Sequence, residues 1–176
     1  MQTEQNKTLE VLKIAIQMEI DGKTYYLKIS QESTNELGKE LLQALAAEED
    51  IHRRKFEEIY KAIEKQKGWP AVDFQPDEGR GLRSVFARAL ENQSASTKPL
   101  STELDAIETA MAMENKTFDF YKNQEQKATY DAERNYYQSL CAQERHHYLV
   151  LLDYYEYLKD PAWWFAKTER PSLDGG

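Results

Sequence analysis

Glu49-Asp50-Ile51-His52 and Glu144-Arg145-His146-His147 are two copies of a Glu-x-x-His motif, 95 residues apart in a chain of 176. Each copy follows a single glutamate by 30 residues, Glu19 in the first half and Glu114 in the second. Residues three apart on a helix project side by side, so the Glu and His of each motif can bind one ion together. Four carboxylates and two imidazoles on four helices are the ligands that a pair of divalent cations needs. We therefore predict a two-metal site.

The spacing of apolar residues predicts four long helices. In four segments, apolar and candidate ligand positions recur in steps of three and four, the spacing of one face of a bundle helix. These segments are 9–26, 42–63, 104–121 and 137–158. All six candidate metal ligands fall on the predicted core face: Glu19, Glu49, His52, Glu114, Glu144 and His147.

Polar and helix-breaking residues predict where these helices begin and end. We expect Thr34, Ser101 and Thr129 to cap the second, third and fourth helices, because a hydroxyl can accept a free backbone N–H. Gly68-Trp69-Pro70 and Asp160-Pro161 end the second and fourth helices, since neither run continues a helix.

The two halves are similar beyond the candidate ligands. Residues matching at the same offset of 95 include Leu9 and Leu104, Met18 and Met113, Tyr26 and Tyr121, and Leu45 and Leu140. The segment of about 68–100 joins the halves and contains one shorter predicted helix, residues 82–92. Short links make the helices of each hairpin antiparallel. We predict an all-α fold of one domain, residues 1–160: a four-helix bundle made of two duplicated helical hairpins with a long crossover.

Residues 161–176 form a short tail that we predict to be helical. It contains Trp163, Trp164 and Phe165. Large aromatic side chains in a row favour burial. We expect this tail to pack on the bundle or on a partner subunit.

Composition excludes several classes of function. Asp and Glu number 31 against 23 Lys and Arg, a net charge of −8, which argues against nucleic acid or an anionic membrane as a partner. Cys141 is the single cysteine, so this sequence holds no disulfide and no cysteine-bound iron centre, and electrons must come from elsewhere. No apolar run reaches the roughly 20 residues that span a bilayer, and the first residues do not resemble a signal peptide. We expect a cytoplasmic protein.

Burial of four carboxylates is the physical reason to favour metal. A single Glu on a helix is usually solvated, but an ionised carboxylate in a bundle core destabilises the fold unless a counter-charge meets it. Two divalent cations supply four positive charges against four negative ones. The alternative is a salt-bridged core with no catalytic role.

Tyr26 and Tyr121 each follow a single glutamate by seven residues, two turns along the same helix face. Each is either an aromatic core residue or a hydrogen-bond donor to a ligand carboxylate. Gly22, one turn after Glu19, either leaves room beside the ions or allows close helix packing. Both interpretations stay open for all three residues.

The six candidate ligands resemble those of the ferritin-like superfamily, and the chain from about Lys7 to Lys159 is most similar to its rubrerythrin branch. The ending, from Trp163 to Gly176, also resembles the tails of stand-alone rubrerythrin-like proteins. The resemblance implies a ferritin-like bundle with a non-haem di-iron centre. In that centre Glu49 and Glu144 would bridge or chelate, His52 and His147 would each complete one iron, and Glu19 and Glu114 would be terminal ligands.

Two features depart from the rubrerythrin pattern. Rubrerythrins usually carry a further Glu one turn after the third-helix ligand, where this chain has Thr117. The single cysteine also indicates that the rubredoxin domain is missing. The remaining six-ligand set is closer to bacterioferritin-type ferroxidase centres.

The resemblance implies a peroxidase-type oxidoreductase active in oxidative stress. Its cofactor would be two iron ions, with manganese possible, and it would reduce hydrogen peroxide or dioxygen to water. A rubredoxin-like or flavin protein would supply electrons, and we expect a homodimer. The alternatives are a ferroxidase that stores iron, a di-iron oxidase with an organic substrate, and a bundle in which metal is only structural.

Overall fold

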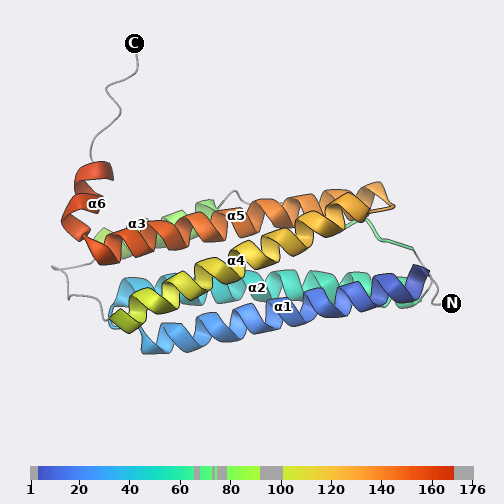
Figure 1. The fold of residues 1–176 in the computed structure, drawn as a ribbon, viewed down its shortest axis with the longest axis horizontal. Coiled ribbons are helices and arrows are strands. Elements are labelled where there is room, and N and C mark those ends of the chain that lie inside the picture. The colour runs from blue at the N-terminus through green and yellow to red at the C-terminus, as the bar shows by residue number, and fades with distance from the viewer. Residues whose placement is uncertain (1–3, 66–67, 73, 75–78, 92–100, 169–176) are drawn as a thin grey trace, which may run out of the picture.

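A computed structural model describes residues 4–65, 68–72, 74, 79–91 and 101–168 of the chain. Within them are six helices and no strand. The helices are α1 (Glu4–Glu32), α2 (Glu36–Glu64), α3 (Arg80–Glu91), α4 (Ser101–Lys127), α5 (Asp131–Lys159) and α6 (Pro161–Thr168), as Figure 1 shows.

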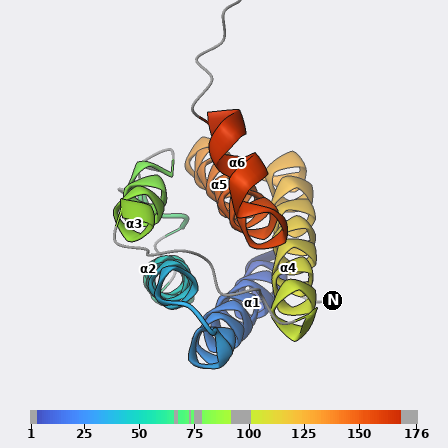
Figure 2. The same cartoon turned by 90° about the vertical axis from the view of Figure 1, so that its left-hand side faces the viewer.

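The four long helices form the predicted bundle. α1 packs along α2 and α4 packs along α5, so each half of the sequence is one antiparallel hairpin. Seen from one end in Figure 2, α1, α2, α4 and α5 take the four corners, and α3 lies outside them, in contact with α2. The predicted all-α bundle of two hairpins with a long crossover is confirmed.

Two helices begin one residue later than the hydroxyl caps would place them. Asn35, and not Thr34, caps α2: its side-chain Oδ1 accepts the backbone N–H of Gly38 at 2.6 Å. At α5 the carboxylate of Glu133 accepts the backbone N–H of Thr129 at 3.0 Å, so Thr129 contributes its backbone and not its hydroxyl. At α2 the Asn35 side chain thus takes the place of the predicted threonine, whereas at α5 the Glu133 side chain reaches back to the backbone before the helix.

Thr34 instead joins a buried polar group at one end of the bundle. The Glu103 carboxylate, near the start of α4, accepts hydrogen bonds from Ser33 (2.7 Å), Thr34 (2.9 Å) and Tyr154 (3.0 Å). Asn35 also donates its side-chain amide to the Tyr154 hydroxyl at 3.0 Å. This network fastens the α1–α2 loop to the second hairpin.

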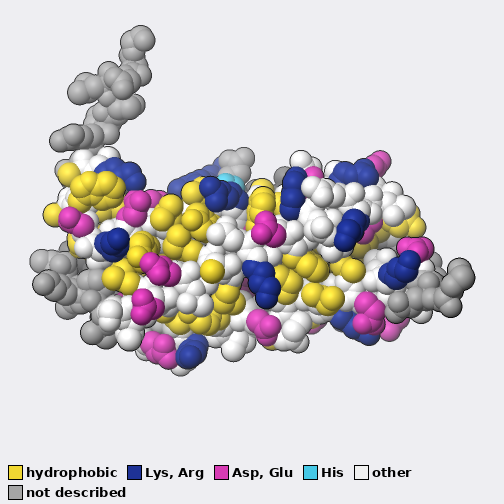
Figure 3. Space-filling view, viewed as in Figure 1, with side chains coloured by type: hydrophobic (Ala, Val, Ile, Leu, Met, Phe, Trp, Pro, Cys, Tyr) yellow, Lys and Arg dark blue, Asp and Glu magenta, His cyan; other side chains and the backbone are white. Residues whose placement is uncertain are grey.

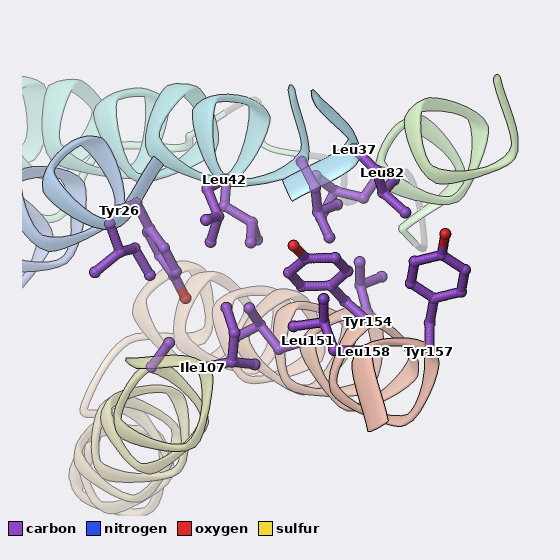
Figure 4. Close-up of a cluster of buried hydrophobic side chains, with 14 of the residues drawn as sticks. Tyr26, Leu37, Leu42, Leu82, Ile107, Leu151, Tyr154, Tyr157 and Leu158 are labelled. Carbon is purple, nitrogen blue, oxygen red and sulfur yellow. The ribbon is translucent and has the colours of Figure 1, made fainter. Parts of the chain in front are cut away.

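The apolar core consists of two clusters. One, drawn in part in Figure 4, gathers Tyr26, Leu42, Ile107 and Leu151, and Leu82 of α3 packs on it. The other gathers Leu12, Phe56, Tyr121, Tyr137 and Leu140. On each long helix the candidate ligands lie between residues of these two clusters. The acidic residues therefore form a buried layer that divides the core.

The tail begins as a helix that contacts α5. Asp160 accepts the backbone N–H of Trp163 at 2.9 Å, and Pro161 occupies the first helical position. Trp164 is buried, with its ring edge-on to Tyr157 at 5.9 Å, whereas the Phe165 side chain is 40% exposed. The remainder of the predicted tail, 169–176, lies outside the described residues.

The surface carries charges of both signs between apolar side chains, as the face in Figure 3 shows. No helix in the described part of the chain is long and apolar enough to cross a membrane.

Candidate metal centre

Each helix of the bundle contributes to one buried acidic cluster. The contributions are Glu19 from α1, Glu49 and His52 from α2, Glu114 from α4, and Glu144 and His147 from α5. All six side chains are buried. The structure thus brings together every residue that the sequence proposed as a ligand.

The first candidate metal position is formed around His52. Its Nδ1 lies 3.4 Å from Glu19 Oε2, 3.6 Å from Glu49 Oε2 and 3.5 Å from Glu144 Oε1. One ligand atom from each of these four residues lies within 4.8 Å of all the others. These four side chains come from three helices, so their convergence depends on the packing of the bundle.

The second candidate position is formed around His147. Its Nδ1 lies 3.2 Å from Glu49 Oε1, 3.5 Å from Glu114 Oε2 and 3.9 Å from Glu144 Oε2. One ligand atom from each of these four residues again lies within 4.8 Å of all the others. Glu49 and Glu144 belong to both groups, and in each of them a different carboxylate oxygen faces each histidine. The arrangement is that of two neighbouring positions with two shared carboxylates.

The spacing of these atoms fits metal ligands. Two ligands bonded to one ion at about 2.1 Å lie about 3.0–3.5 Å apart at the angles usual for protein sites. The distances of 3.2–3.6 Å around the two histidines match that spacing. All but the 3.2 Å contact of His147 with Glu49 are longer than a hydrogen bond of good geometry.

Unpartnered polar atoms provide an independent test of the fit. Five ligand atoms are buried without a hydrogen-bond partner: Glu19 Oε2, His52 Nδ1, Glu114 Oε2, Glu144 Oε1 and His147 Nδ1. A buried polar atom without a partner is destabilising, and native proteins leave few of them. Five converging on one region fit a pair of cations bound among them.

The electrostatics of the metal-free cluster lead to the same conclusion. Burial, together with the nearby Glu49, raises the pKa of Glu19 to about 8. Burial and neighbouring carboxylates raise the pKa of Glu144 well above its usual value. Burial disfavours charged His52, but the Glu19 and Glu49 carboxylates outweigh it and raise the His52 pKa to about 9. Without metal the cluster retains protons, which arriving cations must displace.

Tyr26 and Tyr121 make the hydrogen bonds that one interpretation of their spacing predicted, but across the bundle. The Tyr26 hydroxyl on α1 donates to Glu114 on α4, and the Tyr121 hydroxyl on α4 donates to Glu19 on α1. Both tyrosines are buried. Each therefore orients the glutamate that the opposite hairpin contributes to the cluster.

Glu48 is a contact of the site that the sequence motif did not identify. His147 Nε2 lies 2.9 Å from the Glu48 carboxylate, so this N–H donates to Glu48 and leaves Nδ1 free to face the cluster. Its only signal in the sequence is its place directly before Glu49. The residue in the same place of the second motif is Gln143, so the duplication is broken at this point.

Asp50, the residue after Glu49, fixes α1 against α2. Its carboxylate contacts Lys23 of α1 at 2.8 Å and Arg53 at 3.1 Å, and also pairs with Arg54. Lys23 first, and then the two arginines, hold the pKa of Asp50 well below its usual value. This ion pair links α1 and α2 at the level of the candidate ligands.

Two cavities differ in size and in their relation to the cluster. A space of about 20 Å³ lies between α1 and α4 and is lined by the carboxylates of Glu49, Glu114 and Glu144. A larger cavity, about 210 Å³, is lined by Phe74, Tyr136 and their neighbours. None of the six candidate ligands is among the described residues that line the larger one. The small cavity is therefore the one in contact with the candidate metal centre.

A model of the family described as Rubrerythrin matches residues 10–155, a range that holds all six candidate ligands and both tyrosines. Searches among curated proteins and among solved structures returned no match. The match and the buried cluster of carboxylates and histidines fit a di-iron protein.

Proposed function

This chain belongs to the rubrerythrin family, and from that premise we propose that it reduces hydrogen peroxide, or dioxygen, to water at a di-iron centre. The observation that carries the proposal is the pair of shared carboxylates. Glu49 and Glu144 each face both histidines, so two ions held there are direct neighbours. Two adjacent ferrous ions would supply the two electrons that, with two protons, convert one hydrogen peroxide to two water molecules. Dioxygen needs four electrons and four protons, so the external donor would have to reduce the centre twice for each dioxygen.

The six ligands have distinct proposed roles. Glu49 and Glu144 would hold both ions, and His52 and His147 would each hold one. Glu19 and Glu114 would be terminal ligands, and the hydroxyls of Tyr121 and Tyr26 orient their carboxylates. The tyrosine hydrogen bonds restrain each terminal carboxylate when the charge beside it changes.

The size of the small cavity supports a small oxidant. A cavity needs a volume of about 10–15 Å³ to hold one water molecule. A cavity of about 20 Å³ therefore suits one molecule as small as peroxide or dioxygen. An organic substrate beside the carboxylates needs far more room. This comparison favours peroxide reduction over oxidation of an organic molecule.

The remaining parts of the proposal follow from the ligand types and composition. We propose iron as the metal, although carboxylate and imidazole also suit manganese. A rubredoxin-like or flavin protein would return two electrons, since the single Cys141 leaves the chain without a cysteine-bound centre of its own. We further propose a homodimer in the cytoplasm.

The direct test is stopped-flow oxidation of the protein loaded with two ferrous ions. We expect oxidation to be faster with hydrogen peroxide than with dioxygen. The Glu144→Ala variant, which lacks a shared ligand, should bind fewer than two ions and lose the reaction, while Glu40→Ala, at an exposed glutamate of α2, should behave like the wild type. If peroxide is no faster than dioxygen and Glu144→Ala retains wild-type rates, the proposal is wrong.

A further inference from the structure

We propose that small molecules reach the centre through an opening between α1 and α4, and that Gly22 sets its width. This inference rests on the proposed function, because it assigns the route by which the oxidant arrives. It adds a residue that determines size selectivity and binds no metal.

The outer residues of the opening occupy matching positions in the two halves of the sequence. Its outer lining consists of Met18 and Gly22 from α1 and of Met113 and Thr117 from α4. Met18 matches Met113, and Gly22 matches Thr117, at the offset of 95 residues. Met18, Met113 and Thr117 are partly exposed, whereas the carboxylates at the inner end are buried. The space therefore leads from the surface of the α1–α4 groove to the shared ligands Glu49 and Glu144.

Gly22 is the residue that keeps this space open. A Cβ placed on Gly22 would lie 3.6 Å from Cδ and Cγ of Glu49, an ordinary contact that forces no clash. Since the open space is about 20 Å³, a methyl group at this point would occupy much of it. A glycine inside a helix is less favourable than an alanine, so α1 is weakened at this position. The free volume that Gly22 leaves beside Glu49 explains why a glycine stands at this position.

Thr117 partly fills the corresponding position on α4. Its hydroxyl donates to the backbone carbonyl of Met113 at 3.1 Å, which fixes the side chain against its own helix. The two halves of the opening are consequently unequal, with the wider half beside Gly22. The outer lining carries no charge, which suits a neutral molecule such as hydrogen peroxide or dioxygen.

The test measures access separately from turnover. Nitric oxide, a neutral diatomic molecule, is mixed without oxygen with the protein holding two ferrous ions, and its association is followed by visible absorbance. We expect Gly22→Ala to slow association about 10- to 100-fold, because the added methyl group would fill much of a space of about 20 Å³ without straining the fold. Metal content should stay at two ions per chain and the melting temperature should not fall. The matched control is Asp21→Ala, at the exposed neighbouring residue, which should leave the rate unchanged.

A second variant tests the opposite direction. Thr117→Gly should widen the opening, speed nitric oxide association and let the bulkier tert-butyl hydroperoxide oxidise the centre. Unchanged association in both variants would overturn the proposed route, and so would slowing in Thr117→Gly. A further outcome is that nitric oxide association slows in Gly22→Ala as expected while hydrogen peroxide oxidises neither the wild type nor any variant. In that outcome the route stands and the proposed function fails. If Gly22→Ala loses metal, the Thr117→Gly result alone decides.

Discussion

The carboxylate of Glu48 distinguishes the two candidate metal positions at the level of a single residue. It accepts the Nε2–H of His147 and so fixes the ring nitrogen that faces the ligands. Removing such a partner typically weakens metal binding about 10- to 100-fold. We expect Glu48→Gln to lower the affinity of one of the two ions by that factor, measured by calorimetric titration with ferrous ions.

The matched control is Glu57→Gln, on the same helix, whose carboxylate pairs with Arg53. It should bind both ions as the wild type does. Equal affinities in Glu48→Gln and Glu57→Gln would show that Glu48 does not act on the centre.

Tyr26 and Tyr121 allow a paired test of the terminal carboxylates. Tyr26→Phe removes the hydrogen bond to Glu114, and Tyr121→Phe removes the one to Glu19. A carboxylate released in this way binds metal less well, by about 10- to 100-fold. The control is Tyr155→Phe, whose hydroxyl donates to Glu108 at the surface. Metal titrations that cannot distinguish these three variants would contradict an orienting role.

Local spacing predicted the six ligands but not their neighbours. A Glu and a His three residues apart must share a helix face, so the geometry of the motif is contained in one helix. Tyr26 shares a helix with Glu19 yet contacts Glu114, because the packing of α1 against α4 decides which carboxylate a long side chain reaches. The spacing of apolar residues along either helix does not determine that packing. Glu48 was missed for the same reason, since its partner lies 99 residues away.

At the scale of elements, the close approach of α2 and α5 near Gly38 controls stability. A Cβ on Gly38 would lie 2.2 Å from the Tyr154 hydroxyl oxygen and 2.4 Å from Ser33 Oγ. Tyr154 is buried and hydrogen-bonded, so it has no free space to move into. We expect Gly38→Ala to lower the free energy of unfolding by about 1–3 kcal/mol, measured by urea denaturation.

The Tyr154→Phe background gives the control for Gly38→Ala. It removes the Tyr154 oxygen, the nearer of the two that the new methyl group would meet, so the same glycine substitution should cost less there. An equal cost in both backgrounds would place the strain at Ser33 Oγ, and the metal content of the folded variants should be unchanged.

The ends of the helices were predicted less well than their faces. A buried face is set by a period repeated along many residues, whereas a cap depends on which of several adjacent acceptors reaches a free N–H. Asn35 and Thr34 compete for the start of α2, and Thr34 is drawn away because Glu103 of α4 accepts its hydroxyl. The contact that decides the cap is thus between segments far apart in the sequence.

For the whole molecule, an acidic layer between two apolar clusters makes stability depend on pH and on metal together. In the metal-free protein Glu19 has a pKa of about 8 against a usual 4.5, and His52 about 9 against 6.5. The folded state therefore binds more protons than the unfolded state from about pH 5 to pH 9, and its stability must fall as pH rises through that window. Glu49, whose pKa is lowered, acts with the opposite sign below this window.

We therefore expect the metal-free protein to melt at a lower temperature at about pH 9 than at about pH 6, as followed by circular dichroism. Two bound cations replace the protons, so metal affinity rises with pH and the melting temperatures of the loaded and metal-free protein diverge over the same range. Glu19→Gln cannot ionise and should flatten the metal-free curve. A metal-free protein that becomes more stable as pH rises would mean that these carboxyl groups are not held together in a buried layer.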